Sequence, residues 1–223
     1  MPKETLSIVV LISGSGSNLQ ALIDALAAQS INAEIKAVLS NKADAFGLER
    51  ARKAGIPGLF IDHTAFSDRL GFDQAMINTI DPYHPDIIVL AGFMRILSNE
   101  FVDHYAGRLI NIHPSLLPDF KGLNTHQRAL DAGHKKHGAS VHFVSNELDG
   151  GPVIAQIEVP VEEHDTAETL RLKVIKQEHI IYPRVIQWFA EHRLRLQGQH
   201  IYFDHKLLEK PLLLNSLPAS QTV

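Results

Sequence analysis

Asn111 and His113 are the residues whose type and spacing most clearly indicate chemistry. They lie two apart in the apolar run RLINIH, which is stopped by Pro114. In a strand this spacing turns both side chains to one face, so both can reach a single reacting atom. Two polar side chains on an otherwise apolar strand are costly to bury without partners, so a purely structural explanation is weaker for the pair than for either alone. We therefore interpret the pair as catalytic.

Asp149 is a third candidate, in the turn Asp149-Gly150-Gly151-Pro152. A carboxylate in such a turn is ordinarily only a turn former. Beside a histidine it would raise the imidazole pKa above its reference value of about 6.5 and keep a proton available near neutral pH. The turn alone does not say which histidine, if any, it meets.

The loop Ser13-Gly14-Ser15-Gly16-Ser17-Asn18 joins a predicted strand to a predicted helix. Backbone N–H groups and the positive end of a helix dipole then surround one small concavity, which suits a phosphate. Leu19 stands where a dinucleotide motif has its third glycine, and no lysine follows as in a P-loop. The loop favours a mononucleotide or sugar phosphate, although a tight glycine turn before a helix is structural about as often as functional.

The elements that must position these residues alternate between short apolar strands and helix-like segments. Strands are expected at Ser7–Ser13, Glu34–Ser40, Gly58–Ile61, Asp86–Ala91, Arg108–His113, Ala139–Val144 and Val153–Val159. Helices are expected at Ser17–Gln29, Ala45–Ala54, Ser67–Ile80, Ser98–Tyr105 and Thr166–Arg193, the last with a kink at Pro183 and a hairpin after it around Gly198. This order predicts an α/β fold: a Rossmann-like, mostly parallel twisted sheet with helices on both faces and an antiparallel C-terminal portion.

Domain organisation follows from the absence of repeats and low-complexity linkers. One domain over residues 1–206 is expected, followed by a flexible tail over 207–223, whose sequence has no clear period. The proline and glycine content of the segment from about Leu117 to Thr125 predicts a mobile loop that could close over the site.

Composition narrows the function classes. The chain is 45% hydrophobic and 21% charged, as in ordinary folded proteins, and its net charge of -4 gives no global attraction to nucleic acid or acidic membranes. It has no cysteine, which excludes disulfides, thiolate metal sites and a cysteine nucleophile. No signal peptide and no apolar run of about 18 residues is found, so a cytoplasmic protein with small-molecule partners is expected.

Several segments taken together resemble the folate-dependent formyltransferase family, and within it the glycinamide ribonucleotide formyltransferases of purine synthesis. They are IDHTAFSDR, VLAGFMRIL, INIHPSLLP, SVHFVSNELDGGPVIAQ and QEHIIYP, within a match from about Ser7 to Phe189. The core around Asn111 and His113 is common to the wider family, so it identifies the reaction more firmly than the acceptor. The resemblance implies transfer of the formyl group of 10-formyltetrahydrofolate, a cosubstrate, to the amine of glycinamide ribonucleotide.

The resemblance also implies roles for individual residues. Asn111, His113 and Asp149 would be the catalytic trio: Asn111 and protonated His113 donating to the oxygen of a tetrahedral intermediate, and Asp149 assisting proton transfer. The phosphate loop would be Gly16, Ser17 and Asn18, and Glu178 would bind the ribose hydroxyls. The folate would lie against the trio's Asn111 and Asp149 and against Arg69, Met94, Arg95, Ile96, Leu97, Ser145, Asn146, Glu147 and Leu148, largely through backbone groups.

Two positions depart from the family pattern. Asn124 stands where relatives have a histidine, and Ile175 stands where a polar residue near the phosphate is usual, with Lys176 as a possible substitute. The remaining histidines, His126, His134, His137 and His142, show no zinc-ligand spacing, so no metal is expected. A monomer or a homodimer is equally compatible with the sequence.

Three other functions remain open. Methionyl-tRNA formyltransferase shares the core, but it would normally carry a further C-terminal domain and a basic surface. Formyltetrahydrofolate hydrolase usually has an added N-terminal domain, whereas here the first strand is expected by Ser7. A catalytically silent nucleotide-binding or folate-binding module would explain the glycine loop, but it would leave the trio without a purpose.

Overall fold

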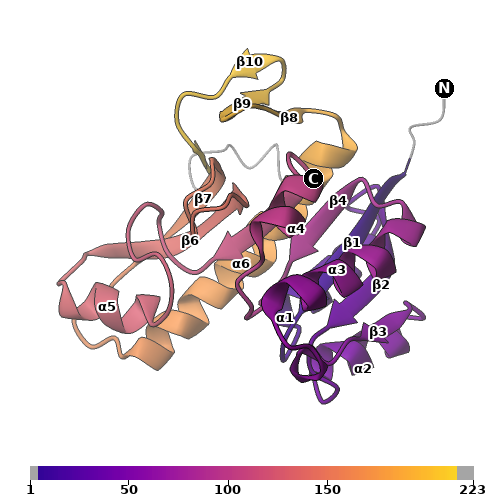
Figure 1. Cartoon of the computed structure of the whole chain (residues 1–223). Coiled ribbons are helices and arrows are strands. Elements are labelled where there is room, and N and C mark those ends of the chain that lie inside the picture. Colours follow the sequence, from indigo (N-terminus) through magenta and orange to yellow (C-terminus); the bar gives the residue numbers. More distant parts are fainter. Residues whose placement is uncertain (1–4, 215–223) are drawn as a thin grey trace.

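One large sheet organises the molecule. The computed structural model describes residues 5–214, in which eight strands lie in the order β11-β7-β6-β5-β4-β1-β2-β3 (Figure 1). Within this sheet only β6 runs against its neighbours, and all the other paired strands are parallel. The strands are β1 Leu6–Ile12, β2 Ala33–Ser40, β3 Gly58–Phe60, β4 Ile87–Leu90, β5 Leu109–His113, β6 Lys136–Phe143, β7 Val153–Pro160 and β11 Leu212–Leu213.

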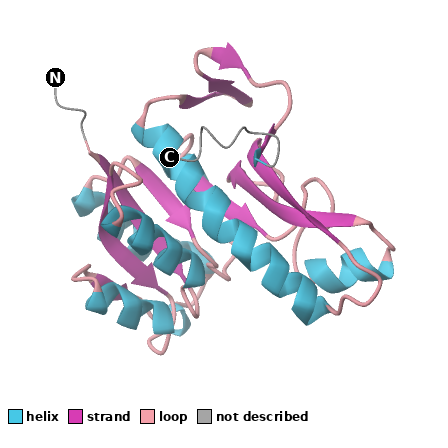
Figure 2. Ribbon diagram, turned by 180° about the vertical axis from the view of Figure 1, so that it is seen from behind, coloured by secondary structure: helices cyan, strands magenta, loops and turns pink. Residues whose placement is uncertain are grey.

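Helices cover both faces of this sheet, as the alternating sequence pattern predicts (Figure 2). The α-helices are α1 Ser17–Ala27, α2 Phe46–Lys53, α3 Arg69–Ile80, α4 Asn99–His104, α5 Thr125–Asp131 and α6 Ala167–Ala190, and the short helices are η1 His63–Ala65 and η2 Asp81–Tyr83. Strand β1 shows why two cores form. Ile8 and Val10 pack in the core that also contains residues of α1 and α6, whereas Val9 and Leu11 face the core of α3 and α4.

The chain changes direction across the sheet at β1. From β1 it proceeds to β2 and β3 on one side, then returns to place β4 and β5 on the other. Ligands of open α/β sheets bind where the strand order reverses in this way, outside the carboxyl ends of the strands. The predicted phosphate loop follows β1, and the predicted folate segment at Met94–Leu97 follows β4, so both lie at this point.

The fold class predicted from the sequence is confirmed, including the antiparallel later portion, where β6 pairs in antiparallel fashion with β5 and β7. A second, three-stranded antiparallel sheet contains β8 Leu194–Gln197, β9 His200–Phe203 and β10 Lys206–Leu207. The first two form the hairpin expected around Gly198, whose φ of 59° is left-handed. The sequence analysis did not predict α5, which lies between β5 and β6.

The predicted C-terminal tail is partly built into the fold. Within the stretch expected to be loose from residue 207, Leu212–Leu213 form β11 and pair in parallel with Ala155 and Gln156 of β7. The backbone hydrogen bonds of an edge strand order this short segment even though it has no periodicity of its own. The rest of the predicted tail, residues 215–223, lies outside the described residues.

Helix α6 is the longest element and ties the two halves of the sheet together. Thr166 begins it with a capping box shared with Thr169. The helix contains Pro183, and it continues through that residue to Ala190. The buried hydroxyl of Tyr182 donates a 2.8 Å hydrogen bond to the carbonyl of Leu90 at the end of β4. No helix among residues 5–214 combines the length and the apolar character needed to span a membrane.

Candidate active site

Asn111 and His113 lie in the last three residues of β5, at the carboxyl end of that strand. Antiparallel pairing sets Asn111 opposite His142 and His113 opposite Ser140 of β6. His113 is buried, whereas Asn111 is only half-buried. The predicted placement of both side chains at one strand end is therefore what the structure shows, with the amide the more accessible group.

Asp149 lies in the loop between β6 and β7, and its carboxylate approaches His113. Its Oδ2 lies 3.4 Å from His113 Nδ1 and accepts a 2.9 Å hydrogen bond from the backbone N–H of Gly122. Its own φ of 47° is left-handed, and a Cβ at Gly151 would collide with the carbonyl of Phe143. The Asp-Gly-Gly sequence thus permits a tight return that brings the carboxylate to the histidine.

His142 is a fourth polar side chain in the cluster, and the sequence analysis did not place it there. Its Nδ1 lies 2.8 Å from the carbonyl of Phe143, an acceptor, so the ring proton belongs on Nδ1. Nε2 is then free to accept from Asn111 Nδ2 at 3.2 Å, and it lies 3.7 Å from Asp149 Oδ1. Burial lowers the pKa of His142, against the smaller opposing effects of Phe143 and Asp149. A neutral His142 that orients the Asn111 amide follows from this arrangement.

A signal for His142 was present in the sequence. It lies in an apolar run of β6, where a polar residue needs a buried partner, and antiparallel pairing with β5 supplies one. Its partner could be identified only once the strand register was known.

A short segment, Phe120–Leu123, crosses the cluster, and we call it the strap. Its Phe120 carbonyl accepts a 3.0 Å hydrogen bond from His113 Nε2. Lys121 forms a 2.7 Å ion pair with Glu147, and its carbonyl accepts from the Arg128 guanidinium at 2.6 Å. Both ring nitrogens of His113 therefore face protein oxygens in this state.

The predicted phosphate loop and the predicted ribose ligand meet where α1 packs against α6 on one face of the sheet. Asn18 Nδ2 donates a 2.8 Å hydrogen bond to Glu178 Oε2 of α6, and both side chains are buried. Burial raises the pKa of Glu178, while Asn18 and Arg171 act more weakly in the opposite direction. Gly16 precedes α1 with a left-handed φ of 67°, and a Cβ there would lie 2.7 Å from Cα of Gly47. The loop is thus held by close backbone packing.

The loop that the resemblance assigns to the folate follows β4, the strand that pairs with β5. Met94 is 68% exposed and Ile96 62% exposed, although both are large apolar side chains. Two exposed apolar groups beside a polar cluster suit a flat ring system. Burial raises the pKa of Asp73, whereas hydrogen bonds with Ser98 and, more weakly, the charges of Arg69 and Arg95 lower it.

The second predicted folate segment, 145–149, follows β6. Asn146 donates from Nδ2 to Asp103 Oδ1 at 3.2 Å, which fastens the segment to α4. Leu148 is exposed, and Ser145 bonds only within its own turn, with the backbone of Glu147. Three of these five side chains are engaged by other parts of the chain, because Asn146 bonds to Asp103, Glu147 pairs with Lys121, and Asp149 faces His113.

The two positions that depart from the family pattern have different surroundings. Asn124 begins α5 with a left-handed φ of 57°, a conformation that asparagine tolerates better than most residues. Ile175 is half-buried on α6, one turn before Glu178, and Lys176 is exposed. Across residues 5–214, no group of three or more histidine and carboxylate side chains is arranged to hold a metal ion.

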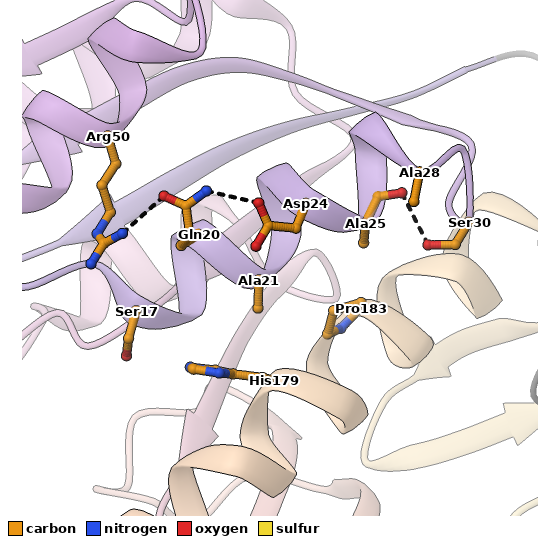
Figure 3. Close-up of a pocket in the computed structure, with 10 residues that line it drawn as sticks. All are labelled: Ser17, Gln20, Ala21, Asp24, Ala25, Ala28, Ser30, Arg50, His179 and Pro183. Carbon is orange, nitrogen blue, oxygen red and sulfur yellow. Dashed lines mark hydrogen bonds between the residues drawn. The ribbon is translucent and has the colours of Figure 1, made fainter.

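A hollow of about 570 Å³ lies beside the phosphate loop, between α1 and α6 (Figure 3). Ser17 lines it at one end, near the hydrogen bond between Arg50 and Gln20, and the ring of His179 faces α1. Arg50 also donates to the carbonyl of Ser15 at 2.8 Å, so it supports the phosphate loop from behind. None of Asn111, His113 and Asp149 lines this hollow, so it is distinct from the polar cluster.

Comparison with known proteins places this architecture in a family. Residues 6–186 match the family model described as formyl transferase. The phosphoribosylglycinamide formyltransferase of Escherichia coli is 56% identical over 203 residues, covering 91% of this chain and 96% of that protein. The solved phosphoribosylglycinamide formyltransferase of Coxiella burnetii superposes with a TM-score of 0.91 at 52% identity, covering 94% of this chain and 99% of that chain. This chain therefore belongs to the formyl transferase family.

Proposed function

We propose that this enzyme transfers the formyl group of 10-formyltetrahydrofolate to the amine of glycinamide ribonucleotide, giving the formylated ribonucleotide and tetrahydrofolate. The observation that carries the proposal is the meeting of Asn111, His113 and Asp149 at a strand end, beside a phosphate-type loop. The names of the relatives support the acceptor. The formyl donor rests on the family and on the exposed apolar residues beside the cluster.

The chemistry needs a group that stabilises negative charge and a group that moves protons. Attack of the amine on the formyl carbon places a negative charge on the former carbonyl oxygen. Asn111 has a second Nδ2 hydrogen left after its bond to His142, and His113 Nε2–H is the second donor. Collapse then breaks the bond from the formyl carbon to the folate nitrogen. That nitrogen gains a proton while the attacking amine loses one.

Asp149 is the group that supports the proton transfer. Its Oδ2 lies 3.4 Å from His113 Nδ1, on the side of the ring opposite the nitrogen that would donate to the developing oxyanion. Either directly or through a water, its carboxylate can take the proton of the attacking amine. No covalent bond to the enzyme forms in this sequence of steps.

The strap has to shift before His113 can act. In this state Nε2 donates to the Phe120 carbonyl at 3.0 Å, and one N–H cannot serve that carbonyl and the formyl oxygen at full strength. The formyl oxygen would replace the Phe120 carbonyl as the acceptor. We therefore infer that productive binding displaces Phe120 from the histidine.

Recognition of the ribonucleotide is assigned to Gly16, Ser17 and Asn18 for the phosphate and to Glu178 for the ribose. The N-terminus of α1 directs free N–H groups at this loop. The 2.8 Å bond between Asn18 and Glu178 brings the two subsites together. The folate is assigned to Arg69, to Met94–Leu97 and to the segment 145–149, with the trio's Asn111 and Asp149.

The proposal extends to the organisation of the protein. Residues 1–206 are proposed to act as a single formyltransferase domain, and β11 adds a strand from beyond that boundary. We also propose that the enzyme works in the cytoplasm on small molecules, as a monomer or a homodimer, without nucleic acid or membrane partners.

Formyl transfer to glycinamide ribonucleotide, followed by the absorbance change as the folate loses its formyl group, tests the function. His113→Ala should lower kcat on the order of a hundredfold to a thousandfold, because it removes a donor to the oxyanion. His164→Ala, at an exposed position, is the matched control. Unchanged turnover in His113→Ala would contradict the mechanism.

Three further outcomes separate the alternatives. Release of free formate without a formylated product would favour a hydrolase. Equal binding of phosphorylated and dephosphorylated acceptor would remove Gly16, Ser17 and Asn18 from the phosphate site. Binding of either substrate without any turnover by the wild-type protein would favour a silent binding module.

A further inference from the structure

Ser13 is buried directly after β1 and joins three segments through one hydroxyl. Its Oγ donates a 2.6 Å hydrogen bond to Asn41 Oδ1, after β2, and accepts a 2.8 Å hydrogen bond from the backbone N–H of Met94, after β4. Its own N–H donates to the carbonyl of Gly92 at 3.1 Å. Ser13 thus connects the start of the phosphate loop to the start of the loop assigned to the folate.

The environment of this hydroxyl leaves it little freedom. Ser13 is 5% exposed and Asn41 is 2% exposed. His63 Nδ1 lies 2.9 Å from the Asn41 carbonyl and 3.4 Å from its Nδ2, which holds the asparagine in place. A hydroxyl has one proton, and here that proton goes to Asn41, so a lone pair of Oγ is directed at Met94.

The far end of the Met94 loop is held independently. Buried Asp73 of α3 accepts a short hydrogen bond from the backbone N–H of Ser98, the residue that caps α4. The segment from Met94 to Ser98 is therefore anchored at both ends, at Ser13 and at Asp73. Ser13 also belongs to the phosphate loop, so a movement of that loop shifts the Met94 end of the segment. The Ser98 end, which bonds to Asp73, stays in place.

We propose that Ser13 is a positioning residue that couples the ribonucleotide site to the folate site. Ser13 is itself the first residue of the phosphate loop, at the reversal of strand order beside β1, and its hydroxyl accepts the hydrogen bond from Met94 in the loop after β4. The inference rests on the proposed function, since it takes the two loops as the two substrate sites. In these terms, ordering of the phosphate loop by a bound ribonucleotide strengthens the anchor on Met94, and the reverse also holds.

Ser7 offers a matched control at the opposite end of the same strand. Its hydroxyl lies 2.9 Å from Asp86 Oδ2 and 3.0 Å from the His84 carbonyl, two acceptors that share its one proton, and it accepts from the Asp86 N–H at 3.0 Å. It thus bridges β1 to the segment before β4, as Ser13 bridges β1 to the segment after β4. Ser7→Ala removes a similar set of bonds far from either substrate loop.

Calorimetric titration with tetrahydrofolate, which has no formyl group to transfer, measures the coupling without turnover. In the wild type, saturating glycinamide ribonucleotide should tighten the Kd of tetrahydrofolate at least about fivefold. Ser13→Ala should bring this ratio close to one and raise the Kd roughly tenfold, because the Met94 N–H loses its acceptor. Asn41→Ala, which frees the Ser13 hydroxyl, should act in the same direction more weakly, and Ser7→Ala should leave the ratio unchanged.

The outcomes decide between coupling and simple stabilisation. A wild-type ratio of one, or an unchanged ratio in Ser13→Ala, overturns the inference. So does an equal change in Ser7→Ala, because the effect would then be general loosening. If Ser13→Ala does not fold, which thermal unfolding shows, Asn41→Ala alone decides. Failure of the wild type to transfer a formyl group would overturn the proposed function itself, whereas transfer with uncoupled binding would overturn only this inference.

Discussion

At the scale of single residues, His142 decides how the Asn111 amide is presented. One of the two Nδ2 hydrogens of Asn111 is donated to the neutral His142 ring. In the proposed mechanism, the other is donated to the oxygen of the intermediate. Asparagine at a half-buried strand end would otherwise be free to rotate about its terminal torsion. Orientation by a buried neighbour removes this freedom before the substrate arrives.

Replacing His142 by glutamine should therefore lower kcat about tenfold to a hundredfold, with a much smaller effect on KM. The cause is loss of a fixed acceptor for Asn111, so the effect should nearly vanish when Asn111 has already been replaced. A double-mutant cycle of His142→Gln and Asn111→Ala measures this directly. Independent, multiplying effects would mean that His142 acts by another route.

The site was only partly predictable at this scale. Spacing on a strand was enough to bring Asn111 and His113 to one face, because the period of a strand is fixed. Asp149 and Glu178 reach the site through the fold, and they were placed by family resemblance. The contact of His142 with Asn111 and the bond of Ser13 to Met94 were not predicted, since strand register and loop packing define these partners.

At the scale of elements, α1 and α6 meet through a buried polar pair. Glu178 bonds to Asn18, which precedes it by 160 residues, in a setting that disfavours its charge. A pKa raised by burial means that the folded state is less stable above that pKa than it would be with a neutral side chain there. The wild-type carboxylate thus lowers the stability of the fold, a cost that is expected of a residue with the proposed role of binding the ribonucleotide.

Glu178→Gln should raise the free energy of unfolding at neutral pH by about 1 kcal/mol, because it keeps an acceptor for Asn18 but removes the buried charge. The same variant should raise KM for glycinamide ribonucleotide on the order of tenfold or more. Urea unfolding and steady-state kinetics on one preparation test both effects. The stability gain should shrink as the pH falls and the wild-type carboxyl takes up a proton; a gain that grows on acidification would contradict the argument.

Element prediction succeeded where the chain carries start and stop signals. Thr166 begins α6 and Ser98 begins α4, each with its side-chain cap as expected. Helix α5 was missed because Asn124 enters it in a left-handed conformation without a side-chain cap, so no start signal is present. Strand β11 was missed because two residues have no periodicity.

At the scale of the whole molecule, the pH dependence of stability has a source in α5 and β6. His126 Nδ1 lies 3.1 Å from His137 Nε2, in the segment that leads from the strap to β6. Burial first, and then the nearby His126, His113 and His134, lower the pKa of His137 to about 4, while a backbone hydrogen bond to Pro114 acts in the opposite direction. Burial also lowers the pKa of His126.

A histidine whose pKa is lower in the folded state than in the unfolded chain stabilises the fold at pH values above its unfolded-state pKa. This stabilisation is lost as the pH falls towards the folded-state pKa. Between pH 6.5 and about 4 the unfolded chain binds a proton at His137 that the folded chain excludes. From a difference between 6.5 and about 4, the loss is at most about 3 kcal/mol. Glu178 and Asp73, whose pKa values are raised by burial, change the stability in the opposite direction as the pH falls. The pH dependence of the wild-type stability is therefore the sum of these opposing contributions.

Comparison of variants with the wild type separates the contribution of His137 from those of the other groups. In urea unfolding between pH 7.5 and 4.5, His137→Gln should be less stable than the wild type at pH 7.5, because it disturbs the bonds to His126 and Pro114, yet it should lose less stability on acidification. The two curves should approach each other as the pH falls. His164→Gln, which replaces an exposed histidine, controls for the loss of a histidine as such. If the free energies of unfolding of His137→Gln and the wild type fall in parallel with pH, proton uptake at His137 is not the cause of the loss of stability in acid.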